Sequence, residues 1–256
     1  MVKNPTKTKK AKRITRLGFY VPKAWTIEKV MENVRKAKEE RDMLLENVRN
    51  LHVSLQNGNN KTGMMSKTVS LYPVLDCNCD GCPCAEICYD MRHDIINKDC
   101  RKYRLINSAI HKADPERYWW EIEKKVKEEF CIFLRGNVGG DLTNDDYLFL
   151  FDMCKRNERC TCQYFSKNYN GGNNAIKANR GELPDNLKLM YSRLPNLECE
   201  NPYEIPESHI NFGVGCPFTG PEYGAYFCNG NCTECFYDMK GCIGAKRRDN
   251  IVLNYH

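Results

Sequence analysis

The pattern of apolar and polar residues changes its period several times along the chain. Between residues 26 and 55, apolar side chains recur every three or four positions, with charged residues between them, as in an amphipathic helix. This stripe comprises Ile27, Val30, Val34, Leu44, Val48 and Leu51. The segment "QNGNNKTG", residues 56–63, is rich in turn-forming residues and interrupts the stripe. We therefore expect a helical extension over residues 26–60 and a domain boundary at its end.

Strand-like and helix-like patterns alternate beyond this break. Strands are predicted at 67–75, 131–135, 160–166, 187–192 and 209–215, and helices at 99–112, at 114–130 and from Thr143 onward. Such alternation is typical of a parallel sheet built from βαβ units. The sequence predicts an α/β fold over residues 61–215: a partial (βα) barrel with about six parallel strands. In such folds the chemistry lies at the carboxyl ends of the strands.

Two of the predicted helices have clear start signals. Asp114 can cap the helix at 114–130, and Pro115 then occupies its first helical position. Its apolar stripe consists of Trp119, Ile122, Val126 and Phe130. Thr143 can cap the following helix, which carries Asp145 and Asp146 in its first turn.

Cysteine is the residue that most changes this picture, because the 256-residue chain contains 16 of them. One cluster follows the first predicted strand, within residues 77–88, and the second lies in the segment 216–256. The clusters consist of Cys77, Cys79, Cys82, Cys84 and Cys88, and of Cys216, Cys228, Cys232, Cys235 and Cys242. Clustered thiols in a reducing compartment more often bind metal than form disulfides. Four thiolates suit either a zinc ion or a four-iron cluster, so we expect two cysteine-rich metal loops.

The other cysteines carry weaker signals. Cys131 lies in a predicted buried strand and is interpreted as a core residue. Cys160 and Cys162 share one face of another strand and are interpreted as core or barrel-lining residues. Cys100, Cys154 and Cys199 stand alone and are expected in the core or at the surface. His93 could replace a thiolate ligand, but a single histidine beside five cysteines is expected to be a bystander.

The segment "GNVGGDL", residues 136–142, is a candidate for cofactor binding. Gly139 and Gly140 would let a ligand approach the backbone after a strand, and Asp141 could hold an ammonium or ribose group. An ordinary strand-to-helix turn would explain the same glycines. Lys167, at the end of the next strand, could face the same site or be a solvated surface lysine.

Charge is concentrated at the N-terminus. Residues 1–25 contain eight Lys or Arg and no acidic residue, whereas the net charge of the whole chain is +6. This basic, flexible arm could attract a polyanion such as nucleic acid, or it could serve only as a solubilising tail. No apolar run approaches eighteen residues and no secretory signal is recognisable, so we expect a cytoplasmic chain without membrane association.

With these residues assembled, the chain resembles the gene-product-eighty-eight-like family of phage and mobile-element proteins. The resemblance covers roughly residues 57–242 and rests on the order of short motifs. These motifs are "GNNKTGMMSKTVSLYP", a cysteine loop closing in "CYD", "GGDL", "FSKN", "LPDNLKLMYS" and a terminal cysteine cluster beginning "GCP". A phage origin would place the protein in the host cytoplasm.

This family layout is itself similar to radical S-adenosylmethionine barrels, which implies a cofactor and an activity. The resemblance implies Cys77, Cys84 and Cys88 as ligands of a 4Fe-4S cluster, and the Gly139–Asp141 turn as a contact of S-adenosylmethionine. An open iron would bind this cofactor, and its reduction would release a radical that abstracts hydrogen from an unnamed substrate. Two departures stand against it: the loop has five cysteines where three suffice, and Tyr89 follows the last cysteine instead of preceding it.

Three functions remain open from the sequence. The leading interpretation is an iron–sulfur protein of radical S-adenosylmethionine type. The alternative is a zinc-stabilised nucleic-acid-binding protein, in which both cysteine clusters are structural and the basic arm contacts phosphates. A third is an interaction protein that uses the helix at 26–55.

Overall fold

The computed structural model describes residues 12–14, 20–22, 26–58, 66–77, 85, 88–193, 199–211, 226–227 and 250–254. The helices are α1 (Ile27–Leu45), α2 (Tyr89–Ile96), α3 (Lys98–Ala113), α4 (Pro115–Glu128), α5 (Asn144–Arg156) and α6 (Tyr169–Ala178). The first five strands are β1 (Lys12–Ile14), β2 (Tyr20–Pro22), β3 (Gln56–Asn57), β4 (Ser66–Val69) and β5 (Phe133–Gly136). The others are β6 (Thr161–Ser166), β7 (Leu187–Arg193), β8 (Glu207–Asn211), β9 (Tyr226–Phe227) and β10 (Asn250–Asn254).

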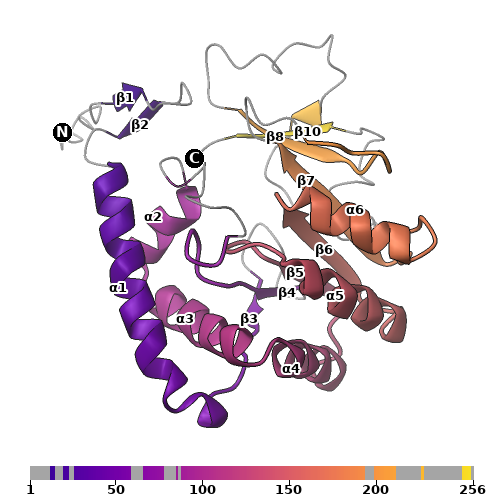
Figure 1. Ribbon diagram of the computed structural model, residues 1–256, viewed down its shortest axis with the longest axis horizontal. Helices are drawn as coiled ribbons and strands as arrows, with labels where there is room; N and C mark the ends of the chain where they lie inside the picture. The colour runs from indigo at the N-terminus through magenta and orange to yellow at the C-terminus, as the bar shows by residue number, and fades with distance from the viewer. Residues whose placement is uncertain are drawn as a thin grey trace, which may run out of the picture.

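One large sheet organises the molecule (Figure 1). It has eight strands in the order β3-β4-β5-β6-β7-β8-β10-β9. The hairpin pair β3–β4 is antiparallel, and every other neighbouring pair is parallel. The predicted α/β fold with a mostly parallel sheet is therefore confirmed. Among the described residues β3 and β9 are the edges of the sheet and do not pair with each other, so the sheet is open.

The helices α3, α4, α5 and α6 follow one another along the sheet, each in contact with the next (Figure 1). The start signals predicted for α4 and α5 are confirmed. The Asp114 carboxylate accepts a hydrogen bond from the Arg117 backbone N–H at 2.9 Å, with Pro115 in the first turn of α4. Thr143 and Asp146 form a reciprocal capping box at the start of α5. These caps fix where each helix leaves the sheet edge.

The main hydrophobic core lies between this sheet and its helices. Trp119, Ile122 and Val126 of α4 are buried in it, as their spacing predicts. Phe130 was expected in the same stripe but is 87% exposed, and this part of the prediction is wrong. The helix ends at Glu128, and Phe130 has a positive φ of 48°, which turns its side chain away from the stripe.

The predicted helix over 26–55 is shorter in the structure. α1 ends at Leu45, and a 3-10 turn covers Val48–Asn50. The apolar periodicity continues past the helix end because residues before and after this end pack against two different apolar clusters. Val30 and Ala37 of α1 belong to a small cluster with α2 and α3, whereas Val48 and Leu51 pack against the main core.

The predicted strand over 67–75 is also shorter, and some elements were not predicted. β4 ends at Val69, and the chain then turns, with Pro73 in the turn and a positive φ of 66° at Val74. The segment interpreted as a turn-rich break contributes β3, and the basic segment contributes the antiparallel pair β1–β2. Helices α2 and α6 were not predicted. In the part of the chain that the structure describes, no helix is long and apolar enough to span a membrane.

Candidate metal centre

The carboxyl ends of β4, β5 and β6 meet at one edge of the sheet, and the predicted cofactor residues lie there. The Leu71 backbone N–H donates to the Gly139 carbonyl at 3.0 Å, and the Asp141 backbone N–H donates to the Asp76 carbonyl at 2.9 Å. Asp76 directly precedes the first loop cysteine, Cys77. The glycine turn is therefore hydrogen-bonded to the segment that leads into the cysteine loop.

Both glycines of this turn are required by close packing. A Cβ at Gly139 would collide with the Asp90 carboxylate and lie 2.8 Å from the Leu71 carbonyl oxygen. Gly140 has a positive φ of 81°, and a Cβ there would lie 2.6 Å from the Leu71 Cβ. The backbone of the turn thus lies directly against the stem of the cysteine loop and against α2, which carries Asp90.

Asp141 is buried, and its carboxylate joins β5 to β6. Oδ1 accepts hydrogen bonds from the Leu142 backbone N–H at 2.8 Å and from the Ser166 hydroxyl at 2.5 Å. Oδ2 accepts one from the Lys167 backbone N–H at 3.0 Å and lies 3.9 Å from the Lys167 ammonium nitrogen. The structure therefore brings Gly139, Gly140, Asp141 and Lys167 together. Their role as cofactor contacts stays a prediction.

Two buried polar atoms at this edge have no hydrogen-bond partner among the described residues. They are the side-chain amide nitrogen of Asn137, at the start of the glycine turn, and Oδ2 of Asp90. Asn137 also has a positive φ of 50°. Buried polar groups in native proteins are nearly always paired. These two atoms are consistent with a polar ligand at this edge.

The cysteine loop is described only at its ends. Cys77 and Cys88 are half-buried and both pack against the small apolar cluster, which comprises Val30, Ala37, Tyr72, Val74, Ala85, Met91 and Leu105. The Cys88 sulfur caps α2 and accepts a hydrogen bond from the Met91 backbone N–H at 3.4 Å. A helix N-terminus stabilises a thiolate, which is the ligand form of cysteine. The two ends of the loop thus return to one place beside the glycine turn.

Several predicted ligands lie outside the described residues. They are Cys79, Cys82 and Cys84 of the loop, and Cys216, Cys228, Cys232, Cys235 and Cys242 of the C-terminal segment. Their assignment as metal ligands stays a prediction.

A buried ion pair and two hydrogen bonds hold Asp76, the residue that leads into the cysteine loop. The Arg41 guanidinium contacts the Asp76 carboxylate at 3.0 Å, and the Ser108 hydroxyl and the Tyr72 backbone N–H also donate to it. Burial raises the pKa of Asp76, although these donors oppose the shift. A carboxylate held from three sides fixes the position of the residue next to Cys77.

Helices α2 and α3 face each other through charged residues. Asp90 and Asp94 lie one turn apart on α2, and Arg104 of α3 pairs with both, at 2.7 Å to Asp90. Burial raises the pKa of Asp94 to about 6, although the Arg104 charge opposes this shift. Burial raises the pKa of Asp90 as well, with Arg104 opposing the shift. When both carboxyls are ionised, this buried network carries one net negative charge.

A group of possible metal ligands, which the sequence did not suggest, lies at the end of this network. A nitrogen of His93, a carboxylate oxygen of Asp94 and the Cys100 sulfur all lie within 4.8 Å of one another. His93 was interpreted as a bystander and Cys100 as a core or surface residue. The signal that could have found them is the short spacing between the three residues, read together with the helix–turn–helix connection at Asn97.

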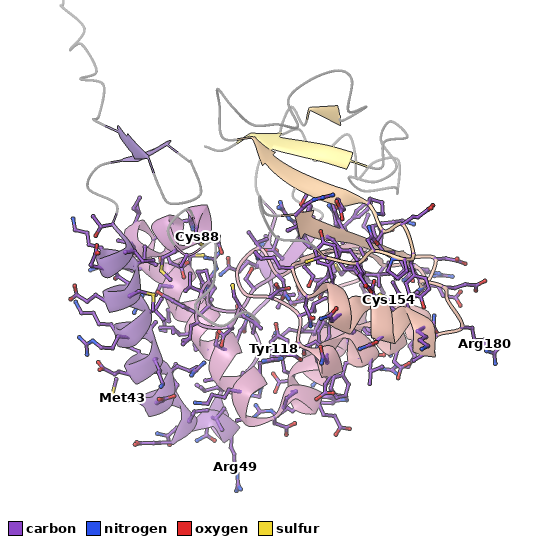
Figure 2. The ribbon with its side chains drawn as sticks, turned by 45° about the horizontal axis from the view of Figure 1, so that its top comes forward. Met43, Arg49, Cys88, Tyr118, Cys154 and Arg180 are labelled. Atoms are coloured by element: carbon purple, nitrogen blue, oxygen red, sulfur yellow. The ribbon has the colours of Figure 1, made fainter. Side chains whose placement is uncertain are left out.

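The remaining cysteines of the sheet core are buried, as predicted for Cys131, Cys160 and Cys162. Cys154 of α5 joins them, and Cys199 is exposed. The four buried thiols contact one another in a row, Cys131 to Cys160 to Cys162 to Cys154. Figure 2 shows Cys154 well apart from Cys88, the described C-terminal end of the cysteine loop.

No protein-family model matches the chain, and the comparisons with curated proteins and with solved structures also gave no match. The resemblance to the gene-product-eighty-eight-like family consequently remains a prediction.

Proposed function

We propose that the protein is a phage or mobile-element iron–sulfur protein, and that it is an enzyme of radical S-adenosylmethionine type. In this proposal the loop of residues 77–88 holds a 4Fe-4S cluster at the carboxyl edge of the sheet. The observation that carries it is the backbone pairing between the glycine turn and the stem of this loop, from Asp141 to Asp76 and from Leu71 to Gly139. A cluster in the loop would lie beside the turn proposed for the cofactor.

The strand order supports a barrel-type arrangement. From β4 to β8, each strand of the sheet pairs with the next one in the sequence. A doubly wound sheet would reverse its order at a switch point, whereas a (βα) barrel keeps consecutive strands adjacent. We therefore infer a partial barrel, with the site at its carboxyl end, where barrel enzymes place their chemistry.

Some residues at this edge of the sheet would position other side chains, and others would contact the bound cofactor. Asp141 holds the end of β6 through Ser166 and Lys167, so it positions the lysine. Asn137 and the backbone of Gly139 and Gly140 would meet the polar part of a bound cofactor. When bound, a 4Fe-4S cluster would supply the electron that cleaves S-adenosylmethionine.

The test is anaerobic purification of the full chain, followed by iron, acid-labile sulfide and visible-absorption measurements. We expect a brown protein with comparable amounts of iron and sulfide. A colourless protein with stoichiometric zinc would overturn the proposal. It would favour the alternative, a zinc-stabilised nucleic-acid-binding protein in the host cytoplasm. That alternative predicts DNA or RNA binding through the basic arm that weakens steeply as salt is added.

A further inference from the structure

The connection between α2 and α3 brings three different ligand types to one point. His93 and Asp94 lie near the end of α2, and Cys100 lies in the first turn of α3. Asn97 links the two helices by capping both. Its backbone N–H donates to the His93 carbonyl at 2.8 Å, and its side chain accepts from the Cys100 backbone N–H at 3.1 Å. This double cap fixes the turn, so the three side chains are held together by local structure.

The spacing of the donor atoms suits a small metal ion. The imidazole nitrogen, carboxylate oxygen and sulfur lie within 4.8 Å of one another. Bonds of about 2.0 to 2.3 Å to a tetrahedral zinc ion would place such donors about 3.5 Å apart. The donor atoms would have to approach one another by about 1.3 Å at most, and the exposed His93 side chain can supply this movement.

A second observation points to a missing partner. Asp94 is fully buried, and Arg104 pairs with its Oδ1 atom. Its Oδ2 atom has no hydrogen-bond partner among the described residues. Besides the Arg104 guanidinium, the Cys100 thiol interacts with this carboxylate, and that thiol is itself one of the three candidate ligands. A buried carboxylate oxygen left unpaired is costly, and a cation beside it would remove that cost.

The local charge also favours a divalent cation. When ionised, Asp90 and Asp94 carry two negative charges, and Arg104 carries one positive charge. Burial raises the pKa of Cys100 to about 11, so a metal ion would have to displace the thiol proton. The resulting thiolate would bring the sum to about −2, which a divalent ion neutralises. Arg104 would then bind the far oxygen of a ligating carboxylate, as outer-shell partners of metal ligands do.

We propose that His93, Asp94 and Cys100 form a mononuclear site for a zinc-class divalent transition metal, separate from the cysteine loop. Nitrogen, oxygen and sulfur donors together match the preference of zinc. Three protein ligands leave one coordination position for water or substrate, and the exposed His93 places the site at the surface. The site does not depend on the proposed iron–sulfur function.

The test uses zinc titration of the full chain, with His93→Gln and Cys100→Ser as the site variants. His52→Gln and Cys199→Ser are matched controls, because both residues are exposed and lie outside the site. We expect each site variant to bind about one zinc equivalent fewer than the wild type, or to bind it at least about 100-fold more weakly. The controls should bind zinc as the wild type does.

Two further readouts keep the test decisive. Zinc should shift the ring ¹⁵N resonances of His93 but not those of His52. Cobalt should give sulfur-to-metal absorption that is weaker in Cys100→Ser than in the wild type and in Cys199→Ser, by the contribution of one site. Iron and sulfide contents should be unchanged in His93→Gln. Equal zinc binding by site variants and controls would overturn the proposal, and so would loss of iron in His93→Gln, because the ligands would then belong to the loop cluster.

Discussion

Cysteine occupies two chemically different regions of this protein. In the sheet core, Cys131, Cys154, Cys160 and Cys162 are surrounded by apolar residues and by one another. Contact with Cys160 and burial raise the pKa of Cys131, so that thiol stays protonated. Beside α2, in contrast, Cys88 accepts a backbone N–H and Cys100 lies next to Asp94 and His93. Burial raises the pKa of Cys100 too, to about 11, with Arg104 opposing the shift and the Asp94 and Asp90 charges adding to it. The two regions therefore differ in the donor groups beside the thiol and not in its protonation.

The comparison shows that the neighbours of a sulfur decide its role more than the count of sulfurs does. The core row has four buried thiols, yet in the described part of the chain no histidine or carboxylate joins them in a possible metal site. The α2 region has fewer described thiols, but it has carboxylates, a guanidinium and unpaired polar atoms. Breaking the charged network and breaking the apolar packing should therefore have different consequences.

The largest expected effect comes from the centre of the charged region. Arg104→Met would leave Asp90 and Asp94 buried without a counter-charge, which typically costs about 3–5 kcal/mol of unfolding free energy. Chemical denaturation measures this loss. Arg35→Met is the control, because its pair with Glu39 is exposed and should contribute at most about 0.5 kcal/mol. Equal stabilities of the two variants would contradict the described network.

A slightly smaller effect is expected where the charged region meets the sheet edge. Gly139→Ala places a methyl group against Asp90 and the Leu71 carbonyl, and such overpacking costs about 2–3 kcal/mol. The same variant should lose iron from the loop, because the turn and the loop stem are joined. Gly181→Ala is the control for iron content: its φ of +86° makes an alanine there cost about 1–2 kcal/mol, but a Cβ meets nothing closer than 3.9 Å, so this variant should keep its iron. Full iron retention by Gly139→Ala would contradict the proposal that the glycine turn supports an iron–sulfur cluster in the loop.

In the apolar region, Cys162→Ser should lower the unfolding free energy by about 1–2 kcal/mol, because it buries a hydroxyl among apolar groups. Its metal content should not change. Cys162→Ala is the companion variant, which removes the sulfur without adding a polar group. A loss of bound metal in both variants would show that the core row holds metal and would end the contrast between the regions.

The smallest expected change in stability comes from the ion pair between Glu123 and Arg156, in which the arginine side chain is largely exposed. The Arg156 guanidinium, at 2.7 Å, lowers the pKa of Glu123 to about 2, with burial opposing the shift and Lys127 adding to it. Because the folded-state pKa lies below the ordinary value, this pair stabilises the protein above pH ~4.5 and loses its effect as pH falls toward 2. Solvent screening limits the gain to less than about 1 kcal/mol. Glu123→Gln should flatten stability against pH in that window, and an unchanged slope would contradict the pairing.

The sequence predicts those parts of the fold that depend on local signals. Asp114, Pro115 and Thr143 mark helix starts through caps, which form between residues three apart. Buried strands such as β6 are evident from short apolar runs. Helix α6 was not predictable in this way, because its glycines are unfavourable in helices. Gly172 is required by the Tyr191 side chain from β7, which lies far away in the sequence.

The candidate site was predictable only in part, for a similar reason. The glycine turn and Lys167 follow strands, so their meeting at one edge follows from parallel topology. The group of His93, Asp94 and Cys100 depends on how Asn97 turns α2 into α3, and on Arg104 reaching back to Asp94. A periodicity of apolar residues carries no information about such polar contacts.

Iron content measured on two cysteine variants tests the central claim most directly. Anaerobically purified Cys88→Ser and Cys162→Ser, which lie in the charged and the apolar region, are compared with the wild type for iron, sulfide and visible absorption. The loop proposal predicts that Cys88→Ser loses iron, sulfide and colour, whereas Cys162→Ser retains all three. Retention of the full iron content by Cys88→Ser, or a wild type without iron, would contradict it.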